Sequence, residues 1–184
     1  MSLYTVYPGG RPPENKTVTI DPQGEVQSIY HKEMVIIEPP EPGDGVMPTL
    51  ETPYGKITSA ICFDFSFPHY IRQAGRAGVD IAFDPSWDWR AIDPLHTWVS
   101  AVRAVENGFS LVRQTNDGLS AAVDHQGRVL ARMDHFTSQE PVMISSVPIE
   151  GVRTVYSRVG DTFAWLCIAV GVWFVGFVVM RRRN

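Results

Sequence analysis

The sequence lacks several features that would place it in a class immediately. Only two of its 184 residues are cysteines, Cys62 and Cys167, and neither has a CxxC neighbour or metal-ligand spacing. This argues against a disulfide framework and against a structural zinc site. Basic charge is also scarce, because 16 Lys and Arg against 20 Asp and Glu give a net charge of -4. A nucleic acid is therefore excluded as the expected partner, and the length suits about one domain.

The two ends of the chain indicate a membrane protein without an export signal. Residues 1–16 have neither a basic region nor an apolar run, so they are not a signal peptide. Residues 162–180 are uncharged, apolar on all sides and about as long as a bilayer is thick, and residues 181–184 are basic. We expect a transmembrane helix in the cell inner membrane, with the basic tail cytosolic and residues 1–158 extracytoplasmic. An extracytoplasmic domain needs an export signal, and residues 1–16 do not supply one. We therefore expect that sequence upstream of Met1 is missing.

The first half of the chain indicates strands and a long loop. Residues 17–32 alternate around an Asp-Pro-Gln-Gly turn, which predicts a β-hairpin with Lys32 at its end. Residues 33–49 are rich in proline and glycine and favour a surface loop. A turn and a buried strand follow within residues 50–61.

The second half alternates helices and strands before the apolar segment. Helical spacing and flanking Pro and Gly residues predict helices over 68–77 and 94–107, separated by a strand from Val79 and a polar aromatic loop. The remaining predicted strands are 109–116, 119–125, 128–133 and 142–149. This order predicts an α/β layered domain.

Cys62 raises a choice between two interpretations. It follows a strand and precedes a change of direction and a helix, which would place its thiol at the carboxyl end of the strand and near a helix N-terminus. The alternative is a buried structural thiol, which is common for free cysteine. His69 lies seven residues further on and is better interpreted as a surface histidine than as a partner of the thiol.

Many short motifs, in a shared order from about Thr17 to the C-terminus, together indicate a family. They are Tyr30–Lys32, Gly55–Cys62, Asp64, Phe67–Pro68, Pro85–Trp89, Arg103–Asn107, Arg113–Asn116, Gly118–Ala121, Asp124–Gly127, Thr154–Tyr156 and Gly160–Asp161. In these motifs the chain resembles the carbon-nitrogen hydrolase (nitrilase) superfamily. The resemblance is greatest to its membrane-embedded branch, the apolipoprotein N-acyltransferases and their relatives.

The resemblance implies a partial nitrilase-type αββα sandwich, followed by one transmembrane helix, and a Glu-Lys-Cys triad. Cys62 would form a thioester, and Lys32 and the backbone N–H after the nucleophile would stabilise the oxyanion. No cofactor and no metal are implied. The family glutamate lies on an earlier strand, and Glu14 and Glu25, expected in a loop and a hairpin turn, are poor substitutes. We therefore expect an N-terminally truncated fragment or a degenerate copy.

The loop after Lys32 offers a second carboxylate. The following Pro-Gly-Asp-Gly favours Glu38, whereas spacing from Lys32 favours Glu41, and either can also be an ordinary solvated loop residue. We predict Glu38 as the catalytic one. Glu106 either points toward the lysine region or belongs to a solvent network on its helix.

Aromatic residues near the cysteine are candidates for substrate binding. We predict this role for Phe63, Trp87 and Trp89, with aromatic packing as the alternative for the two tryptophans. His96 matches a histidine position that is common in the family and either caps its helix or packs in the core.

The expected organisation is a nitrilase-like domain over 1–158, a membrane helix over 162–180 and a basic tail over 181–184. The expected function is transfer of an acyl group from a phospholipid, through a thioester on Cys62, to the amine of a lipoprotein. Two alternatives remain open. One is a membrane-tethered amidase that acts on a small amide, and the other is a non-catalytic remnant that lacks the triad glutamate.

Overall fold

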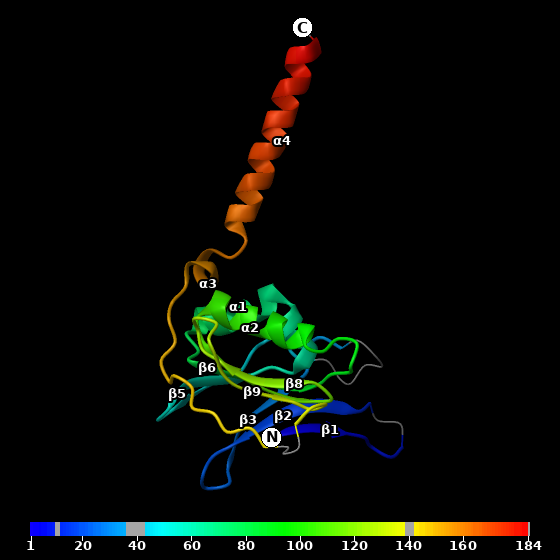
Figure 1. The fold of residues 1–184 in the computed structure, drawn as a ribbon, viewed down its shortest axis with the longest axis vertical. Coiled ribbons are helices and arrows are strands. Elements are labelled where there is room, and N and C mark those ends of the chain that lie inside the picture. The colour runs from blue at the N-terminus through cyan, green and yellow to red at the C-terminus, as the bar shows by residue number, and fades with distance from the viewer. Residues whose placement is uncertain (10–11, 36–42, 139–141, 184) are drawn as a thin grey trace.

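The computed structural model describes residues 1–9, 12–35, 43–138 and 142–183. Its described part contains two β-sheets, helices packed on one of them, and a long C-terminal helix that extends away from the body (Figure 1). The predicted α/β class is confirmed.

The smaller sheet is antiparallel and contains β1 (Ser2–Thr5), β2 (Glu14–Ile20) and β3 (Val26–His31). The predicted hairpin is confirmed as β2 and β3, and Lys32 directly follows β3. One expectation was wrong, because Glu14 is not a loop residue but the buried first residue of β2, where it forms an ion pair with Lys16. Strand β1, which pairs with β2, was not predicted.

The larger sheet has six strands in the order β4-β5-β6-β7-β8-β9. The strands are β4 (Thr49–Thr52), β5 (Gly55–Ser59), β6 (Ile81–Trp87), β7 (Ser110–Asn116), β8 (Leu119–Val123) and β9 (Val129–Asp134). β5, β6 and β7 are parallel, and the other neighbouring pairs are antiparallel. The carboxyl ends of the three parallel strands therefore meet at one edge, where sites of open α/β sheets form.

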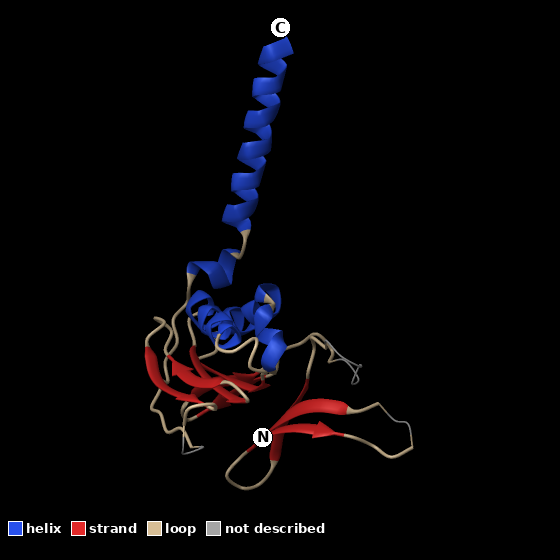
Figure 2. Cartoon of the chain, turned by 45° about the vertical axis from the view of Figure 1, so that its right-hand side comes forward, coloured by secondary structure: helices blue, strands red, loops and turns tan. Residues whose placement is uncertain are grey.

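Two helices connect the parallel strands and cover one face of the larger sheet. They are α1 (Pro68–Ala77) and α2 (Leu95–Asn107), and each ends at a glycine in the left-handed conformation, as predicted. Their apolar faces, including Ile71 and Ala104, are buried. The smaller sheet lies on the side opposite the helices (Figure 2). The described residues thus form helix, sheet and sheet layers of the expected partial sandwich.

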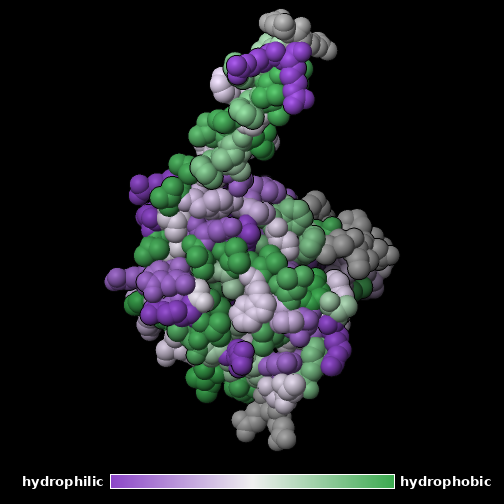
Figure 3. Space-filling view, turned by 45° about the horizontal axis from the view of Figure 1, so that its top comes forward, coloured by the Kyte–Doolittle hydropathy of each residue, from purple (hydrophilic) through white to green (hydrophobic). Residues whose placement is uncertain are grey.

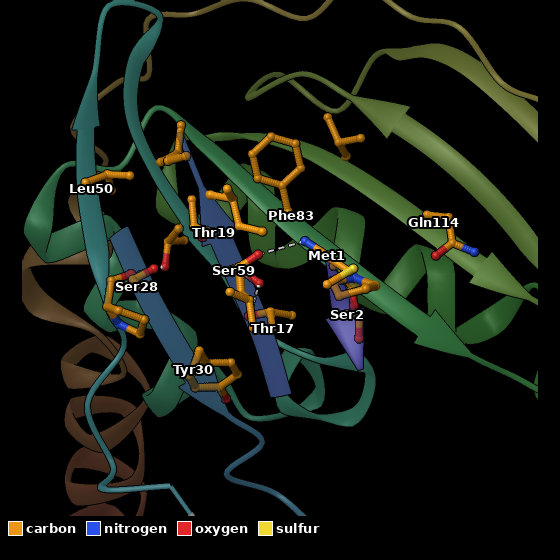
Figure 4. A pocket seen from close by; sticks show the side chains of 18 residues that line it. Met1, Ser2, Thr17, Thr19, Ser28, Tyr30, Leu50, Ser59, Phe83 and Gln114 are labelled. Atoms are coloured by element: carbon orange, nitrogen blue, oxygen red, sulfur yellow. Dashed lines mark hydrogen bonds between the residues drawn. The ribbon is translucent and has the colours of Figure 1, made fainter. Parts of the chain in front are cut away.

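A cavity of about 680 Å³ lies between the two sheets. The smaller sheet lines it with residues such as Thr17 and Tyr30, and the larger sheet with residues such as Phe83 and Gln114 (Figure 4). Ser59 Oγ of the larger sheet donates a hydrogen bond to Thr17 Oγ1 of the smaller sheet at 2.9 Å. The two sheets therefore do not interdigitate fully over this region.

The predicted strand over 142–149 is wrong. This segment has no regular structure, and its apolar side chains face solvent, with Ile144 89% exposed. Together, residues 142–153 form an irregular segment that we call the strap. Two hydrogen bonds fix it: Ser110 Oγ donates to the carbonyl of Pro148 at 2.9 Å, and Val152 N–H donates to the carbonyl of Gly108 at 2.7 Å. Residues 142–149 have no strand partner in either sheet of the described structure.

The strap leads into a short helix that the sequence reading missed, α3 (Val155–Val159). Thr154 caps it, because its hydroxyl accepts a hydrogen bond from Ser157 N–H at 3.0 Å.

The predicted C-terminal helix is confirmed as α4 (Thr162–Arg183). It is long and apolar enough to cross a membrane, and none of that apolar stretch is buried against the body. Its surface is hydrophobic along its length, with hydrophilic atoms near its far end (Figure 3).

Candidate active site

Cys62 lies at the edge where the parallel strands end. β5 ends at Ser59, and Cys62 begins the 3-10 helix η1 (Cys62–Ser66) with a φ of 52°. Its N–H donates to Asp84 Oδ1 at 2.9 Å, and its half-buried Sγ lies 3.9 Å from the carbonyl oxygen of Trp87. The predicted helix after the cysteine is confirmed as α1, but it begins only at Pro68, and η1, which was not predicted, lies before it. The α1 N-terminus therefore does not account for the state of the thiol.

Asp64 connects the turn at Cys62 to the chain beside Lys32. Its buried carboxylate accepts hydrogen bonds from Tyr30 Oη at 2.6 Å, Met34 N–H at 2.7 Å and Ile61 N–H at 2.8 Å. Tyr30 and Met34 flank Lys32 in the sequence, and Ile61 precedes Cys62. These bonds bring the predicted nucleophile and the predicted cation to the same place.

The environment of Cys62 favours its thiolate. Burial raises the pKa of the thiol, but a hydrogen bond with His96 and the positive charge of Lys32 lower it, and the net pKa lies below its ordinary value. The negative charge of Asp84 acts in the opposite direction. Cys62 therefore has the electrostatic surroundings of a reactive cysteine, and the structural-thiol alternative is disfavoured.

His96 is the histidine at this site. It is the second residue of α2, is buried, and has its Nδ1 2.8 Å from Asp88 Oδ1. Burial lowers its pKa, but the hydrogen bonds with Asp88 and Cys62 raise it to about 9 overall. The expectation that His96 only caps or packs is too limited, because its polar contacts connect Asp88 to Cys62.

Arg113 holds the acidic residues of this edge in place. Its guanidinium is fully buried in β7, forms an ion pair with Asp84, and donates from Nη2 to Asp88 Oδ2 at 2.7 Å. It also donates to Ser86 Oγ at 2.7 Å and to Thr97 Oγ1 at 3.1 Å. A buried cation with several well-placed acceptors fixes these side chains in one arrangement.

The donor atoms of Cys62, Asp88 and His96 lie within 4.8 Å of one another, which is also compatible with a metal ion. However, both oxygens of Asp88 are already engaged, one with His96 and the other with Arg113. A carboxylate held on both oxygens is a poor metal ligand, so the arrangement favours a hydrogen-bonded chain.

The predicted aromatic residues differ in their exposure and in their contacts. Trp87 and Trp89 are 69% and 55% exposed, so aromatic packing in the core is not their role. Trp87 donates from Nε1 to Asp117 Oδ2 at 2.8 Å. Phe63 is half-buried, with its ring centroid 5.2 Å from that of Phe67 and 6.3 Å from that of His96.

The other residues considered in the sequence lie elsewhere or outside the description. Glu38 and Glu41 both lie outside the described residues. Glu106 forms an ion pair at 2.7 Å with Arg103 of its own helix. His69 is exposed on α1, so its interpretation as a surface histidine is confirmed.

Sequence reasoning missed the roles of Asp84, Asp88 and Arg113. A signal was present, because Arg113 lies in the apolar strand segment Ser110–Asn116, where a charged side chain needs a partner. Asp84 within the neighbouring strand β6, and Asp88 directly after it, supply that partner, but only strand order shows this.

Comparisons with known proteins agree with this geometry. The family model described as "Carbon-nitrogen hydrolase" matches residues 4–156. Similar curated proteins include the apolipoprotein N-acyltransferases of Geobacter metallireducens, 34% identical over 73% of this chain and 26% of that protein, and of Gloeobacter violaceus, 35% identical over 73% and 27%. The chain spans about a quarter of the length of these relatives.

Solved structures show the same fold. Saccharomyces cerevisiae Nit3, a member of the nitrilase superfamily, matches with a TM-score of 0.65 and 24% identity over 73% of this chain and 54% of that one. An amidase from Nesterenkonia sp. AN1 matches with a TM-score of 0.64 and 24% identity over 72% of this chain and 57% of that one.

Proposed function

The chain belongs to the carbon-nitrogen hydrolase family, and from this premise we propose that it acts in acyl transfer, with Cys62 as the nucleophile. The observation that supports this most is the position of Cys62 at the end of a parallel strand, with a lowered thiol pKa beside the charge of Lys32. A thiolate held near a fixed cation can attack an acyl carbonyl and stabilise the resulting oxyanion.

In the proposed reaction, the Cys62 thiolate attacks the ester carbonyl of a phospholipid acyl chain. The C–S bond forms, the ester C–O bond breaks, and the departing alcohol takes a proton. The amine of a lipoprotein then attacks the thioester and releases the thiolate. Lys32 and the N–H of Phe63 would stabilise both oxyanions, since an N–H in the first turn of η1 has no acceptor within that helix.

We also assign roles in the proposed reaction to four residues that the sequence analysis singled out. Glu38 would be the loop carboxylate of the catalytic set, and Phe63, Trp87 and Trp89 would contact substrate. Both tryptophans are exposed, and the carbonyl oxygen of Trp87 lies 3.9 Å from the Cys62 sulfur, which supports contact with a ligand.

We assign residues 1–158 to the catalytic domain, 162–180 to a membrane helix and 181–184 to a basic tail. Arg181 and Arg182 follow the apolar part of α4, which supports a cytosolic tail and an extracytoplasmic domain in the inner membrane. An acyl group from a membrane lipid would then be available beside the domain.

The test is the intact mass of the chain reconstituted in phospholipid vesicles, beside a Cys62→Ala variant. We expect a fatty-acyl adduct that hydroxylamine removes and that Cys62→Ala lacks. Absence of the adduct from a folded chain would contradict the acyl-transfer proposal and favour a non-catalytic remnant.

A second candidate is a membrane-tethered amidase, which the fold shared with the Nesterenkonia amidase supports. Water would then replace the lipoprotein amine as the acceptor, and a small amide would replace the phospholipid. Release of free acid from a small amide without any lipid requirement would favour this candidate over the transferase.

A further inference from the structure

Positive charge gathers at the end of the body from which α4 extends. Arg72 and Arg76 lie one turn apart on α1, so their side chains share a face of that helix. Arg158 is on α3, which contacts α1 and lies near the start of α4 (Figure 1). A Cβ atom at Gly160 would overlap with the guanidinium of Arg72, so this face of α1 lies directly beside the chain that enters α4. We call Arg72, Arg76 and Arg158 the basic face.

The charges of the basic face are not neutralised within the described part of the chain. None of its three guanidiniums has a hydrogen-bond or ion-pair partner among the described residues, and hydrophilic atoms lie on the body close to the start of α4 (Figure 3). Two carboxylates of this end of the body have other partners. Glu106 pairs with Arg103 at 2.7 Å, and Asp161 accepts a hydrogen bond from Tyr156 Oη at 3.3 Å. A chain with a net charge of -4 thus has unpaired positive charge where α4 begins.

Exposed apolar side chains accompany these charges on α3. Val155 and Val159 lie one turn apart and are 75% and 47% exposed. Basic and apolar side chains on one surface suit the boundary between lipid headgroups and hydrocarbon, because the cations bind anionic headgroups and the apolar groups reach the acyl chains.

The covalent chain keeps this surface close to α4. Arg158 precedes Thr162, the first residue of α4, by four positions, so their Cα atoms are at most about 14 Å apart. If α4 enters a bilayer, Arg158 is therefore within reach of the headgroups of that bilayer. Arg72 is held at the same level by its contact with Gly160.

We propose that the basic face binds the phosphates of anionic phospholipids at the surface of the bilayer that α4 enters, with Val155 and Val159 in the headgroup layer. This inference rests on the proposed membrane helix and adds which face of the body meets the lipid. A guanidinium binds a phosphate through two parallel N–H bonds, so arginine suits this partner. The contacts hold the helical layer, and not the smaller sheet, against the membrane.

The test measures how close position 155 lies to the membrane surface. The full-length chain carries Cys62→Ser, Cys167→Ser and Val155→Cys, and its single thiol is labelled with a fluorophore. It is reconstituted in vesicles that contain a lipid with a quencher on its headgroup, made from phosphatidylcholine with or without phosphatidylglycerol. We expect at least about twofold stronger quenching with phosphatidylglycerol, and loss of this difference at about 1 M salt, where screening limits electrostatic attraction to about 3 Å.

A control label tests the orientation of the body. Gln23→Cys replaces Val155→Cys and lies in the turn between β2 and β3, which Figure 1 shows at the end of the body away from α4. We expect little quenching there with either lipid. Equal quenching at positions 23 and 155 would overturn the proposal.

A pair of substitutions tests the arginines themselves. Arg76→Gln with Arg158→Gln should remove most of the quenching that depends on phosphatidylglycerol, and both residues are exposed, so the fold is not at risk. Arg90→Gln with Arg132→Gln is the matched control, because it removes the same charge from two other exposed positions of the body. Equal loss in the two pairs, or quenching that ignores phosphatidylglycerol and salt, would overturn the basic face.

Resistance of the bound chain to carbonate extraction reports on α4 separately. A resistant chain with the same quenching in both lipids would retain the membrane helix and remove the basic face. A chain that carbonate extracts, but that binds phosphatidylglycerol vesicles through Arg76 and Arg158 in a salt-sensitive way, would retain the basic face and remove the membrane helix. Neither result depends on acyl transfer, since the labelled proteins lack the Cys62 thiol.

Discussion

At the scale of single residues, the backbone of Cys62 is the unusual feature. Its φ of 52° lies in the left-handed region, where a side chain costs about 1–2 kcal/mol relative to glycine. The strained turn is held by the hydrogen bond from Cys62 N–H to Asp84 and by those that Asp64 accepts. These contacts keep the sulfur at the end of β5 and close to His96.

This strain predicts an order of stability between two variants of Cys62. The free energy of unfolding of Cys62→Gly should be about 1 kcal/mol higher than that of Cys62→Ala, because only glycine adopts this φ without a penalty. Urea denaturation of the two variants in the same detergent measures the difference. Equal stability, or a more stable alanine variant, would show that the turn is unstrained.

At the scale of elements, α2 connects the site to the strap that follows β9. Its start supplies His96, and its end, Gly108, has a φ of 81° and accepts the hydrogen bond from Val152 N–H at 2.7 Å. A Cβ atom at position 108 would overlap with the carbonyl oxygen of Val152. The end of α2 thus depends on close contact with a backbone about forty residues further along the chain.

Gly108→Ala should therefore lower the free energy of unfolding by more than about 2 kcal/mol, because steric overlap adds to the left-handed penalty. Gly24→Ala is the matched control, since Gly24 has a φ of 88° but nothing within 4 Å of an added Cβ. We expect the control to lose only about 1 kcal/mol in the same denaturation experiment. A similar loss of unfolding free energy in both variants would mean that the strap can move away from residue 108 without cost.

At the scale of the whole molecule, the body and α4 differ in where their apolar residues lie. The body has a buried apolar core between α1, α2 and the larger sheet under a surface of mixed polar and apolar areas, whereas the apolar side chains of α4 are exposed (Figure 3). A helix that is apolar on every side and is not buried against the other described residues is stable in a bilayer, where its backbone bonds are satisfied internally. The active-site edge and the helix would then be held on one membrane surface.

A charge in the middle of α4 should disturb this association. Each of Val170→Arg and Val172→Arg costs roughly 2.5–3.5 kcal/mol of insertion free energy near the centre of a membrane helix, so the double variant should lose carbonate-resistant binding to vesicles. Val142→Arg is the control, because Val142 is 69% exposed in the strap. If the double variant floats with vesicles as fully as the unaltered chain, α4 does not insert.

The sequence alone determined the features that depend on local periodicity and on short motifs. Hydrophobic spacing, turn residues and flanking glycines predicted β2, β3, α1, α2 and the apolar helix α4, since these signals act over a few residues. The motifs around Lys32 and Cys62 indicated the family. The prediction of a strand over 142–149 was wrong, because an alternating pattern does not reveal whether a partner strand exists.

Only the tertiary structure decided which groups surround the thiol. Asp88 directly follows β6, His96 is on α2, and Arg113 is on β7. The parallel order of the strands brings these residues to the edge where Cys62 lies. The sequence correctly placed His69 on the surface, but it gave no sign that His96 is the histidine beside the thiol. Long-range contacts of this kind depend on strand order and helix packing, and no local pattern encodes them.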